Sequence, residues 1–259
     1  MKNYDKYTLI TGGTEGIGFE LSKLFARDGH NLIIIARNEE KLVKVQEQLE
    51  KEFSIKVKIL SLDLSVNNSC EKLFAFVEKN ELSVDNLVNN AGVGSFGALF
   101  YENVDTVDNL IKININSLTN ITYYFLKKMV ANNEGSILNV ASTAAFSAGP
   151  KMGIYYASKA YVLSLTESIH EEVRDKNIKV SCLCPGAVRT GFQGKAGIIK
   201  NEKAKSLMME ARDVAKVAYK EFKKGKAIII PGYKNKILVW ANKFIPRSLA
   251  RKIVMYSNK

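Results

Sequence analysis

The chain has 259 residues, of which 46% are hydrophobic and 25% charged; this suits one folded α/β domain and excludes a disordered chain. Three cysteines cannot make a disulfide framework, and the Cys182–Cys184 pair with only two histidines elsewhere makes a poor zinc site, so no metal is expected. The net charge is +12, and the excess lies in residues 195–259, which hold 17 Lys and Arg against 4 Asp and Glu. No apolar run is long enough to span a membrane, and we expect a cytoplasmic protein.

A glycine-rich turn near the N-terminus is the first feature that predicts chemistry. Residues 7–10 read as a short buried strand, residues 11–18 read TGGTEGIG, and apolar residues recur at helical spacing behind them. Glycines allow a tight turn and let a phosphate approach the start of the helix, where backbone N–H groups and the helix dipole favour an anion. The spacing is not G-x-G-x-x-G, so a turn that only lets the helix pack is the alternative.

Short apolar segments alternate with helical segments along the rest of the chain. Strands are expected at 31–36, 55–62, 84–88, 136–141 and 227–231, and helices include 103–131, 154–175 and 214–222. This alternation is typical of right-handed βαβ units. We therefore predict an α/β fold with a single doubly wound parallel sheet of the Rossmann type, covered by helices on both faces. One dinucleotide-binding catalytic domain is expected over residues 1–259.

The end of the second predicted strand carries a candidate for cofactor selection. Arg37 directly follows residues 31–36, at the place where a dinucleotide fold meets the adenosine ribose. An acid there would bind the 2′-hydroxyl of NAD, whereas an arginine accommodates the 2′-phosphate of NADP. The alternative is a solvated loop residue, because Asn38 looks like the cap of the next helix. Position and charge favour the phosphate, so NADP(H) is expected in preference to NAD(H).

Three polar residues further along the chain suggest proton transfer. Ser142 follows the strand at 136–141, Tyr155 comes 13 residues later, and Lys159 lies four beyond it. A Tyr and a Lys at i and i+4 share one helix face, so the ammonium should lower the pKa of the phenol and make Tyr155 a general acid and base. Ser142 could donate to the same substrate oxygen. Taken alone, these residues are better explained as a surface pair and a turn serine, because the Y-x-x-x-K spacing occurs often by chance.

In their order, these motifs resemble the short-chain dehydrogenase/reductase family over nearly the whole chain, and in particular a bacterial NADP-dependent subgroup of unassigned substrate. TGGTEGIG matches the family's TGxxxGxG turn, NNAG at 89–92 its sheet motif, and PGAVRT at 185–190 its PGxVxT segment. The resemblance implies the catalytic residues Asn114, Ser142, Tyr155 and Lys159. It implies the cofactor-binding residues Gly12, Thr14, Glu15, Gly16, Ile17, Gly18, Arg37, Asp63, Leu64, Asn90, Ala91, Gly92, Tyr155, Lys159, Val188 and Thr190. Glu15 stands where some NADP-dependent members have a basic residue.

The resemblance also implies the reaction, an oxidoreduction of the EC 1.1.1 type in which hydride passes between NADP(H) and a carbonyl or alcohol. Residues 191–210 would form a substrate lid. Its apolar residues, together with a wall of Phe146 and Met152, favour a hydrophobic or acyl-type ketone or aldehyde. The family's habit implies a homodimer or homotetramer. The alternative is an NADP-binding sensor or a membrane-surface interaction protein with little turnover.

Residues 234–259 form a basic amphipathic extension with seven basic and no acidic residues. Ile237, Trp240, Ala241 and Phe244 fall at i, i+3, i+4 and i+7, and Leu249, Ile253 and Val254 form a second short apolar set. We favour packing of this apolar face on the body of the protein or across an oligomer interface. A peripheral contact with an anionic membrane is the alternative. Nucleic-acid binding is the weakest interpretation, because no recognised motif accompanies the charge.

Overall fold

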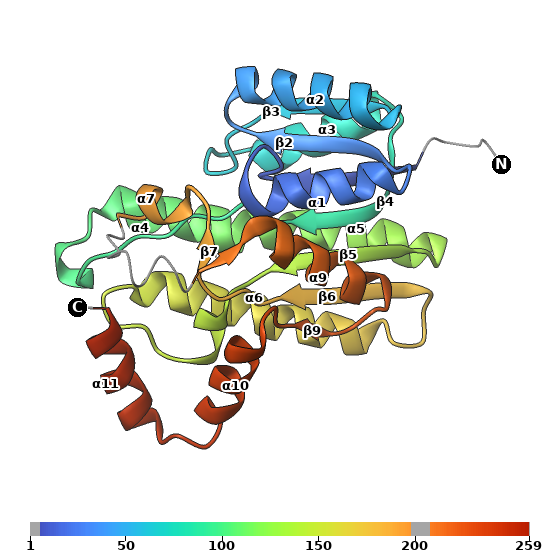
Figure 1. Cartoon of the computed structure of the whole chain (residues 1–259). Coiled ribbons are helices and arrows are strands. Elements are labelled where there is room, and N and C mark those ends of the chain that lie inside the picture. The colour runs from blue at the N-terminus through green and yellow to red at the C-terminus, as the bar shows by residue number, and fades with distance from the viewer. Residues whose placement is uncertain (1–5, 198–207, 259) are drawn as a thin grey trace.

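The computed structural model describes residues 6–197 and 208–258, and a parallel sheet forms its centre (Figure 1). In this part of the chain seven strands pair in the order β3-β2-β1-β4-β5-β6-β9. Their bounds are β1 (Lys6–Thr11), β2 (Asn31–Ala36), β3 (Val57–Ser61), β4 (Ser83–Asn89), β5 (Gly135–Val140), β6 (Ile178–Leu183) and β9 (Ile228–Ile229). The strand order reverses between β1 and β4, so the prediction of a doubly wound parallel sheet is confirmed.

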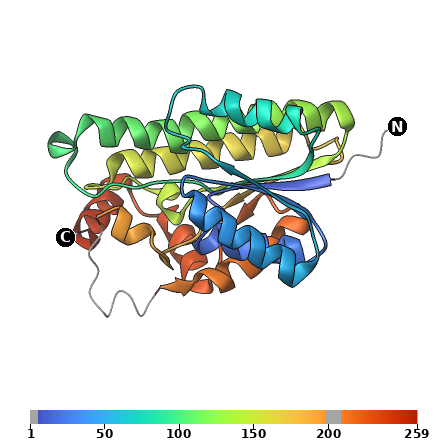
Figure 2. The same cartoon turned by 90° about the horizontal axis from the view of Figure 1, so that it is seen from above.

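Helices cover both faces of this sheet (Figure 2). One face carries α1 (Gly16–Arg27), α2 (Glu39–Phe53) and α9 (Ala211–Lys223). The other face carries α3 (Ser69–Lys79), α4 (Val104–Ile111), α5 (Leu118–Asn132) and α6 (Gly153–Glu172). The strands are apolar on both sides, as the NLIIIA run of β2 predicts, because a sheet covered on both faces has no side in contact with water.

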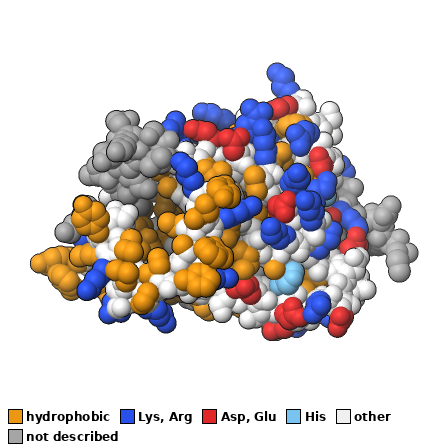
Figure 3. Space-filling view, turned by 60° about the horizontal axis from the view of Figure 1, so that its bottom comes forward, with side chains coloured by type: hydrophobic (Ala, Val, Ile, Leu, Met, Phe, Trp, Pro, Cys, Tyr) orange, Lys and Arg blue, Asp and Glu red, His pale blue; other side chains and the backbone are white. Residues whose placement is uncertain are grey.

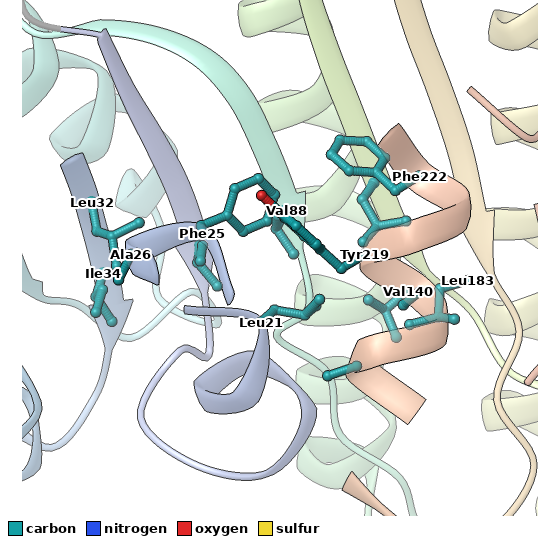
Figure 4. Packing of buried hydrophobic residues seen from close by; sticks show 14 of the residues in the cluster. Leu21, Phe25, Ala26, Leu32, Ile34, Val88, Val140, Leu183, Tyr219 and Phe222 are labelled. Carbon is teal, nitrogen blue, oxygen red and sulfur yellow. The ribbon is translucent and has the colours of Figure 1, made fainter. Parts of the chain in front are cut away.

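Aromatic packing joins the first helix to the last helix of the same face (Figure 4). Phe25 of α1 is fully buried and meets Tyr219 of α9 edge to face, with ring centres 4.8 Å apart. Phe222, one turn further along α9, also packs against the Phe25 ring, with ring centres 6.1 Å apart. Such edge-to-face pairs add to the free energy of burying the rings. They hold α1, and with it the glycine turn that precedes this helix, against the sheet.

The long helix expected at 103–131 is divided by a wider turn. Residues Lys112–Ser117 form a π-helical stretch between α4 and α5, and Asn114 lies within it, fully buried. A π-helical turn adds a residue to the helix and often marks a functional site. The sequence predicted a continuous helix here, because apolar spacing does not distinguish an α-turn from a π-turn.

Short elements complete the fold, and two of them lie within the predicted lid. They are η1 (Leu99–Tyr101), η3 (Thr143–Phe146), β7 (Val188–Arg189), α7 (Phe192–Lys195) and β8 (Met209–Glu210), and β7 pairs with β8 in parallel. The chain just before the region 191–210 and the end of that region therefore lie side by side, in a sheet separate from the main one. The predicted lid residues Ile198, Ile199 and Leu207 lie outside the described residues.

The basic extension folds into two helices, α10 (Tyr233–Asn242) and α11 (Arg247–Ser257), which form a V at one end of the molecule (Figure 1). The expectation that its apolar stripe packs on the body is wrong for this chain by itself, since Ile237, Trp240 and Phe244 are exposed. The buried residue of α10 is Val239, and the buried residue of α11 is Ala250. No helix within the described residues combines the length and the apolar character that a bilayer crossing requires.

The glycine turn allows a direct test of the packing. A Cβ atom on Gly18 would overlap the carbonyl oxygen of Gly12 and the side-chain amide of Asn90. We therefore expect Gly18→Ala to lower the free energy of unfolding by about 1–3 kcal/mol, the usual cost of an overpacked site. Gly153→Ala is the matched control, because nothing lies within 4 Å of a Cβ there and the residue begins α6. Urea denaturation of both variants measures the difference, and an equal stability would contradict the packing.

Candidate active site

A cavity of about 910 Å³ opens where parallel strands β1, β2, β4 and β5 end. It lies at the point where the strand order reverses, which is where open α/β sheets bind ligands. Every predicted cofactor-binding residue except Gly18 lines it. Gly18 is buried in α1, and its missing side chain leaves space for the neighbouring glycine turn. Of the predicted catalytic residues, Ser142, Tyr155 and Lys159 line the cavity and Asn114 lies behind its wall.

A set of hydrogen bonds holds the glycine turn against the end of β4. The Asn90 side-chain amide donates to the carbonyl oxygens of Thr11 at 3.0 Å and of Gly12 at 2.9 Å. In return, Thr11 Oγ1 accepts from the backbone N–H groups of Asn90 and Ala91 at 3.1 and 3.0 Å. Gly12 and Gly16 have φ angles of +66° and +58°, which favour glycine. The resulting cradle lacks Cβ atoms at the positions where a pyrophosphate would approach, so the residues present fit a dinucleotide.

The structure brings Ser142, Tyr155 and Lys159 together from two elements. Tyr155 lies in the first turn of α6, beside Ser142, whose hydroxyl acts to lower the pKa of the phenol. Ser142 caps η3, where its Oγ accepts from the backbone N–H of Ala144 at 3.1 Å. Lys159 Nζ donates to the carbonyl oxygen of Val140 at 2.9 Å and lies 5.8 Å from the centre of the Tyr155 ring. A phenol, a hydroxyl and an ammonium thus converge at the end of β5.

Burial changes the acidity of two of these groups in opposite directions. It raises the pKa of Tyr155 to about 12, although the neighbouring Ser142 hydroxyl acts to lower it. It lowers the pKa of Lys159 to about 8, because the charged ammonium loses its contact with water. The expectation that Lys159 lowers the pKa of Tyr155 is therefore wrong for the chain as it stands, since loss of solvation dominates both groups.

Asn114 links three parts of the wall. Its side-chain amide donates to the carbonyl oxygen of Val93 at 2.9 Å and to Ser158 Oγ of α6 at 3.0 Å, and its Oδ1 accepts from the backbone N–H of Val93 at 2.9 Å. Gly92 lies between Asn114 and Lys159, where a Cβ would come within 3.4 Å of both side chains. Asn114 thus joins the π-helical stretch to α6 and to the loop after β4.

The charged end of the cavity contains basic residues that were not among the predicted site residues. Lys41 of α2 lines the cavity beside Arg37, and its Nζ lies 3.2 Å from Glu15 Oε2. Arg37 Nη1 lies 3.7 Å from Asp63 Oδ2. A signal in the sequence could have indicated Lys41 as a residue of this site. Asn38 caps α2 by accepting from the backbone N–H of Lys41, so Lys41 lies in the first turn of a helix that begins just after β2.

Glu15 has two basic partners, since Lys195 of α7 also pairs with it. The hydrogen bond from Lys195 and the weaker one from Lys41 together lower the pKa of Glu15, in spite of its burial. Glu15 cannot itself bind a phosphate, but its ion pairs hold the two cations Lys41 and Lys195 at the cavity.

Apolar side chains line the other end of the cavity. Phe96, Met152 and Phe192 lie there, and the Phe192 ring is 5.5 Å from that of Tyr155. Met152 is where the sequence predicted an apolar wall, whereas Phe146 packs into a small core cluster and does not line the cavity. Asn258, after α11, was not predicted and also lines the cavity.

No three His, Cys, Asp or Glu side chains are arranged to hold a metal ion in residues 6–197 and 208–258. Cys70, Cys182 and Cys184 are buried thiols. Cys182 and Cys184 lie side by side in the core, with their sulfur atoms 3.7 Å apart. They pack as small apolar residues.

Comparisons with known proteins agree with this geometry. A 7beta-hydroxysteroid dehydrogenase of Mediterraneibacter gnavus is 28% identical over 240 residues, which cover 92% of this chain and 90% of that protein. A very-long-chain 3-oxoacyl-CoA reductase-like protein of Arabidopsis thaliana is 33% identical over 204 residues, which cover 77% of this chain but only 65% of the relative's length. A solved structure, a short-chain dehydrogenase from Sphingobium yanoikuyae in complex with NADPH, is 28% identical, with a TM-score of 0.83 over 92% of this chain and 94% of that chain.

The family itself follows from a match along most of the chain. Residues 6–199 match the family model described as short chain dehydrogenase, which spans the glycine turn, the catalytic residues and the PGAVRT segment. The family's members carry out oxidoreduction with a nicotinamide cofactor. The chain therefore belongs to the short-chain dehydrogenase/reductase family, as an oxidoreductase that acts on carbonyl or alcohol groups.

Proposed function

We propose that this protein is an NADP(H)-dependent reductase of hydrophobic or acyl-type ketones or aldehydes. The observation that carries the proposal is one cavity, which combines a basic nucleotide end at Arg37 and Lys41, a proton donor at Tyr155, and apolar walls at Phe96 and Met152. The names of two relatives refer to a hydroxysteroid and to a very-long-chain 3-oxoacyl-CoA, both of which are large and mainly apolar. They support an apolar substrate here.

The residues of the charged end would hold the cofactor. The glycine turn would receive the pyrophosphate, Arg37 and Lys41 the 2′-phosphate, and Lys159 the nicotinamide ribose. When bound, the nicotinamide supplies the hydride for reduction or accepts it for oxidation. The pairing of Arg37 with Asp63 and of Lys41 with Glu15 keeps both cations at this end, where a phosphate can take the place of a carboxylate.

Tyr155 would donate the proton that completes the reduction. With a pKa of about 12 the phenol holds its proton at neutral pH, so its O–H can donate to the carbonyl oxygen of the substrate. Ser142 would donate a hydrogen bond to the same oxygen as negative charge develops on it. The charged Lys159 would stabilise the phenolate that remains. Hydride on the carbonyl carbon and the Tyr155 proton on the oxygen then give the alcohol.

We further propose that the protein forms a homodimer or homotetramer through its long helices. The outer faces of α5 and α6 carry exposed apolar side chains, among them Tyr123 at 64% exposure and Tyr161 at 37%. Exposed aromatic residues on two helices that cover the same face of the sheet are suited to pairing with a second copy.

Removal of the Tyr155 hydroxyl tests the proton donor. We expect Tyr155→Phe to lower kcat for ketone reduction by about a hundredfold or more, because the general acid is lost, while NADPH binding persists. Tyr161→Phe is the matched control, since this exposed tyrosine of the same helix bonds only to Thr119 among the described residues. NADPH consumption with a panel of apolar ketones measures the effect. Equal turnover of Tyr155→Phe and the unaltered protein would favour the alternative of an NADP-binding sensor.

Cofactor preference is tested at the two cations. Arg37→Ala and Lys41→Ala should each weaken NADPH binding by roughly tenfold, the loss of one charge-assisted contact of about 1.4 kcal/mol, and leave NADH binding nearly unchanged. Lys44→Ala is the control, because this residue lies on the exposed side of α2 and does not line the cavity. Fluorescence titration gives all the dissociation constants. A parallel loss of NADH affinity would mean that the cations act on the fold and not on the phosphate.

The pH dependence follows from the two shifted groups. The lowered pKa of Lys159 means that its charge is present well below pH 8 and is lost as the pH rises through about 8. Tyr155 stays protonated over this range because its pKa is about 12. We therefore expect kcat/KM for reduction to fall above about pH 8. Initial rates with NADPH measure the profile, and a rate that stays constant up to about pH 10 would contradict the assignment.

A further inference from the structure

The two C-terminal helices present an apolar surface that the other described residues leave exposed. Its large apolar side chains expose between 40% and 78% of their area, namely Tyr233, Ile237, Leu238, Trp240, Phe244, Leu249, Ile253, Met255 and Tyr256. We call these residues the C-terminal apolar surface. With the lower end of Figure 1 turned forward, Figure 3 shows hydrophobic side chains gathered on this side of the molecule, with Lys and Arg among them. Exposed apolar patches of this kind mark sites of interaction.

The pattern on each helix is regular. On α10 the exposed residues Tyr233, Ile237 and Trp240 fall at i, i+4 and i+7, and Phe244 continues the stripe, with its ring centre 4.8 Å from that of Trp240. The buried Val239 lies on the opposite side of this helix. Helix α10 thus packs one narrow face against the protein and exposes its larger apolar face, as helices at a membrane interface do.

The second helix follows the same rule. Leu249 and Ile253 fall at i and i+4 and are each half exposed, whereas Ala250 is buried. A shallow hollow of about 430 Å³ beside them is lined by Pro150, Arg251, Lys252, Met255 and Tyr256. Apolar and basic side chains therefore meet along α11.

The charge of this segment decides between possible occupants. The described part of the extension contains no acidic residue and the basic residues Lys234, Lys236, Lys243, Arg247, Arg251 and Lys252. A second copy docked by the same face would bring these cations together, which is unfavourable. An anionic lipid surface complements them, because basic residues beside an interfacial helix contribute about 1 kcal/mol each to membrane binding. We propose that α10 and α11 dock on an anionic lipid bilayer, with the apolar surface in the interface and the basic side chains at the headgroups.

Hydrogen bonds hold the two helices to the protein, so a docked surface would fix the orientation of the whole molecule. The side-chain amide of Asn242, at the end of α10, donates to the carbonyl oxygen of Phe146. That of Asn258, just after α11, donates to the carbonyl oxygen of Pro150 at 2.9 Å. Both anchors lie in the segment that follows Ser142, and Asn258 lines the cavity. Docking would therefore bring the apolar end of the cavity to the membrane side of the molecule.

A neighbouring loop extends the apolar surface. Phe100 and Tyr101 of η1 are 80% and 84% exposed. The loop before them is held to the same segment, since the backbone N–H of Gly97 donates to the carbonyl oxygen of Lys151 at 2.8 Å. Aromatic side chains at the edge of such a surface suit the headgroup region of a bilayer.

The chain contains one tryptophan, Trp240, and its position in the surface makes the test direct. Full-length protein is titrated with vesicles of phosphatidylcholine alone and of phosphatidylcholine with phosphatidylglycerol. We expect the fluorescence of Trp240 to shift to shorter wavelength, and the protein to float with the vesicles, only when the anionic lipid is present. Added salt should reverse both effects, because it screens the lysines and arginines.

Two double variants separate the charge from the apolar face and keep Trp240 as the probe. R251Q with K252Q should weaken vesicle binding by roughly tenfold or more, and I237Q with F244Q should abolish the shift. These side chains are exposed, so the fold is expected to persist. K44Q with K51Q on α2 is the control with the same change of charge, and it should bind like the unaltered protein.

Several results would overturn the proposal. One is the absence of a spectral shift and of flotation with anionic vesicles, for protein that is folded by circular dichroism. Another is equal binding to vesicles of phosphatidylcholine alone. A third is a stable dimer in solution that I237Q with F244Q converts to monomers, since a second copy would then occupy the surface. Retention on duplex DNA without vesicle binding would assign the charge to nucleic acid instead. None of these outcomes depends on the proposed reductase activity, which is measured separately.

Discussion

The close approach of the glycine turn to the end of β4 is the constraint on which the rest of the site depends. The Asn90 amide bonds to two carbonyl groups of the turn, and Thr11 Oγ1 bonds to two N–H groups of the facing loop. This hydrogen-bond network can form only if residue 18 is a glycine, because a Cβ there would occupy the same space as the Gly12 carbonyl oxygen. These contacts fix the shape of the crevice between β1 and β4, and the candidate catalytic residues Ser142, Tyr155 and Lys159 line the same cavity.

Loss of solvation dominates the acid–base properties of the site. Burial disfavours the charged form of each group, so it raises the pKa of Tyr155 and lowers that of Lys159. At neutral pH both groups therefore hold a proton. The pKa of the Tyr155 phenol, about 12, lies far above this pH, whereas that of the Lys159 ammonium, about 8, lies close to it. Such a pair is prepared to donate a proton to a carbonyl oxygen, which is the reductive direction of the reaction that we propose.

The two ends of the cavity differ in a way that matches the two halves of the reaction. The charged end has exposed ion pairs, in which Arg37 and Lys41 lie against Asp63 and Glu15. Pairs of this kind contribute little to stability in water, so a phosphate can displace them at low cost. The apolar end borders the C-terminal helices, whose exposed face combines apolar and basic residues and lacks acids in the described residues. A charged nucleotide and an apolar substrate would thus enter different environments.

The fold was predictable from the sequence because its signals are local. Short apolar runs such as NLIIIA, separated by helical spacing, predict parallel strands and crossover helices, and both are present. The position of Ser142 at the end of β5, and of Tyr155 and Lys159 on one face of α6, followed from the same patterns, as did the place of Arg37 after β2.

Other features depended on packing between distant segments. The π-helical turn holds Asn114 where its one buried amide bonds to both Val93 and Ser158. The pKa of Tyr155 rises because the assembled wall removes water, which a Tyr–Lys spacing cannot reveal. The apolar stripe of α10 has the same spacing whether it faces a core or the solvent, and only the docking of Val239 turns Trp240 outward. The sequence by itself determined the order of the strands along the chain and the identity of the reactive groups, since these follow from local periodicity and residue type. The tertiary structure decided solvation, exposure and long-range contacts, because each of these depends on which segments meet.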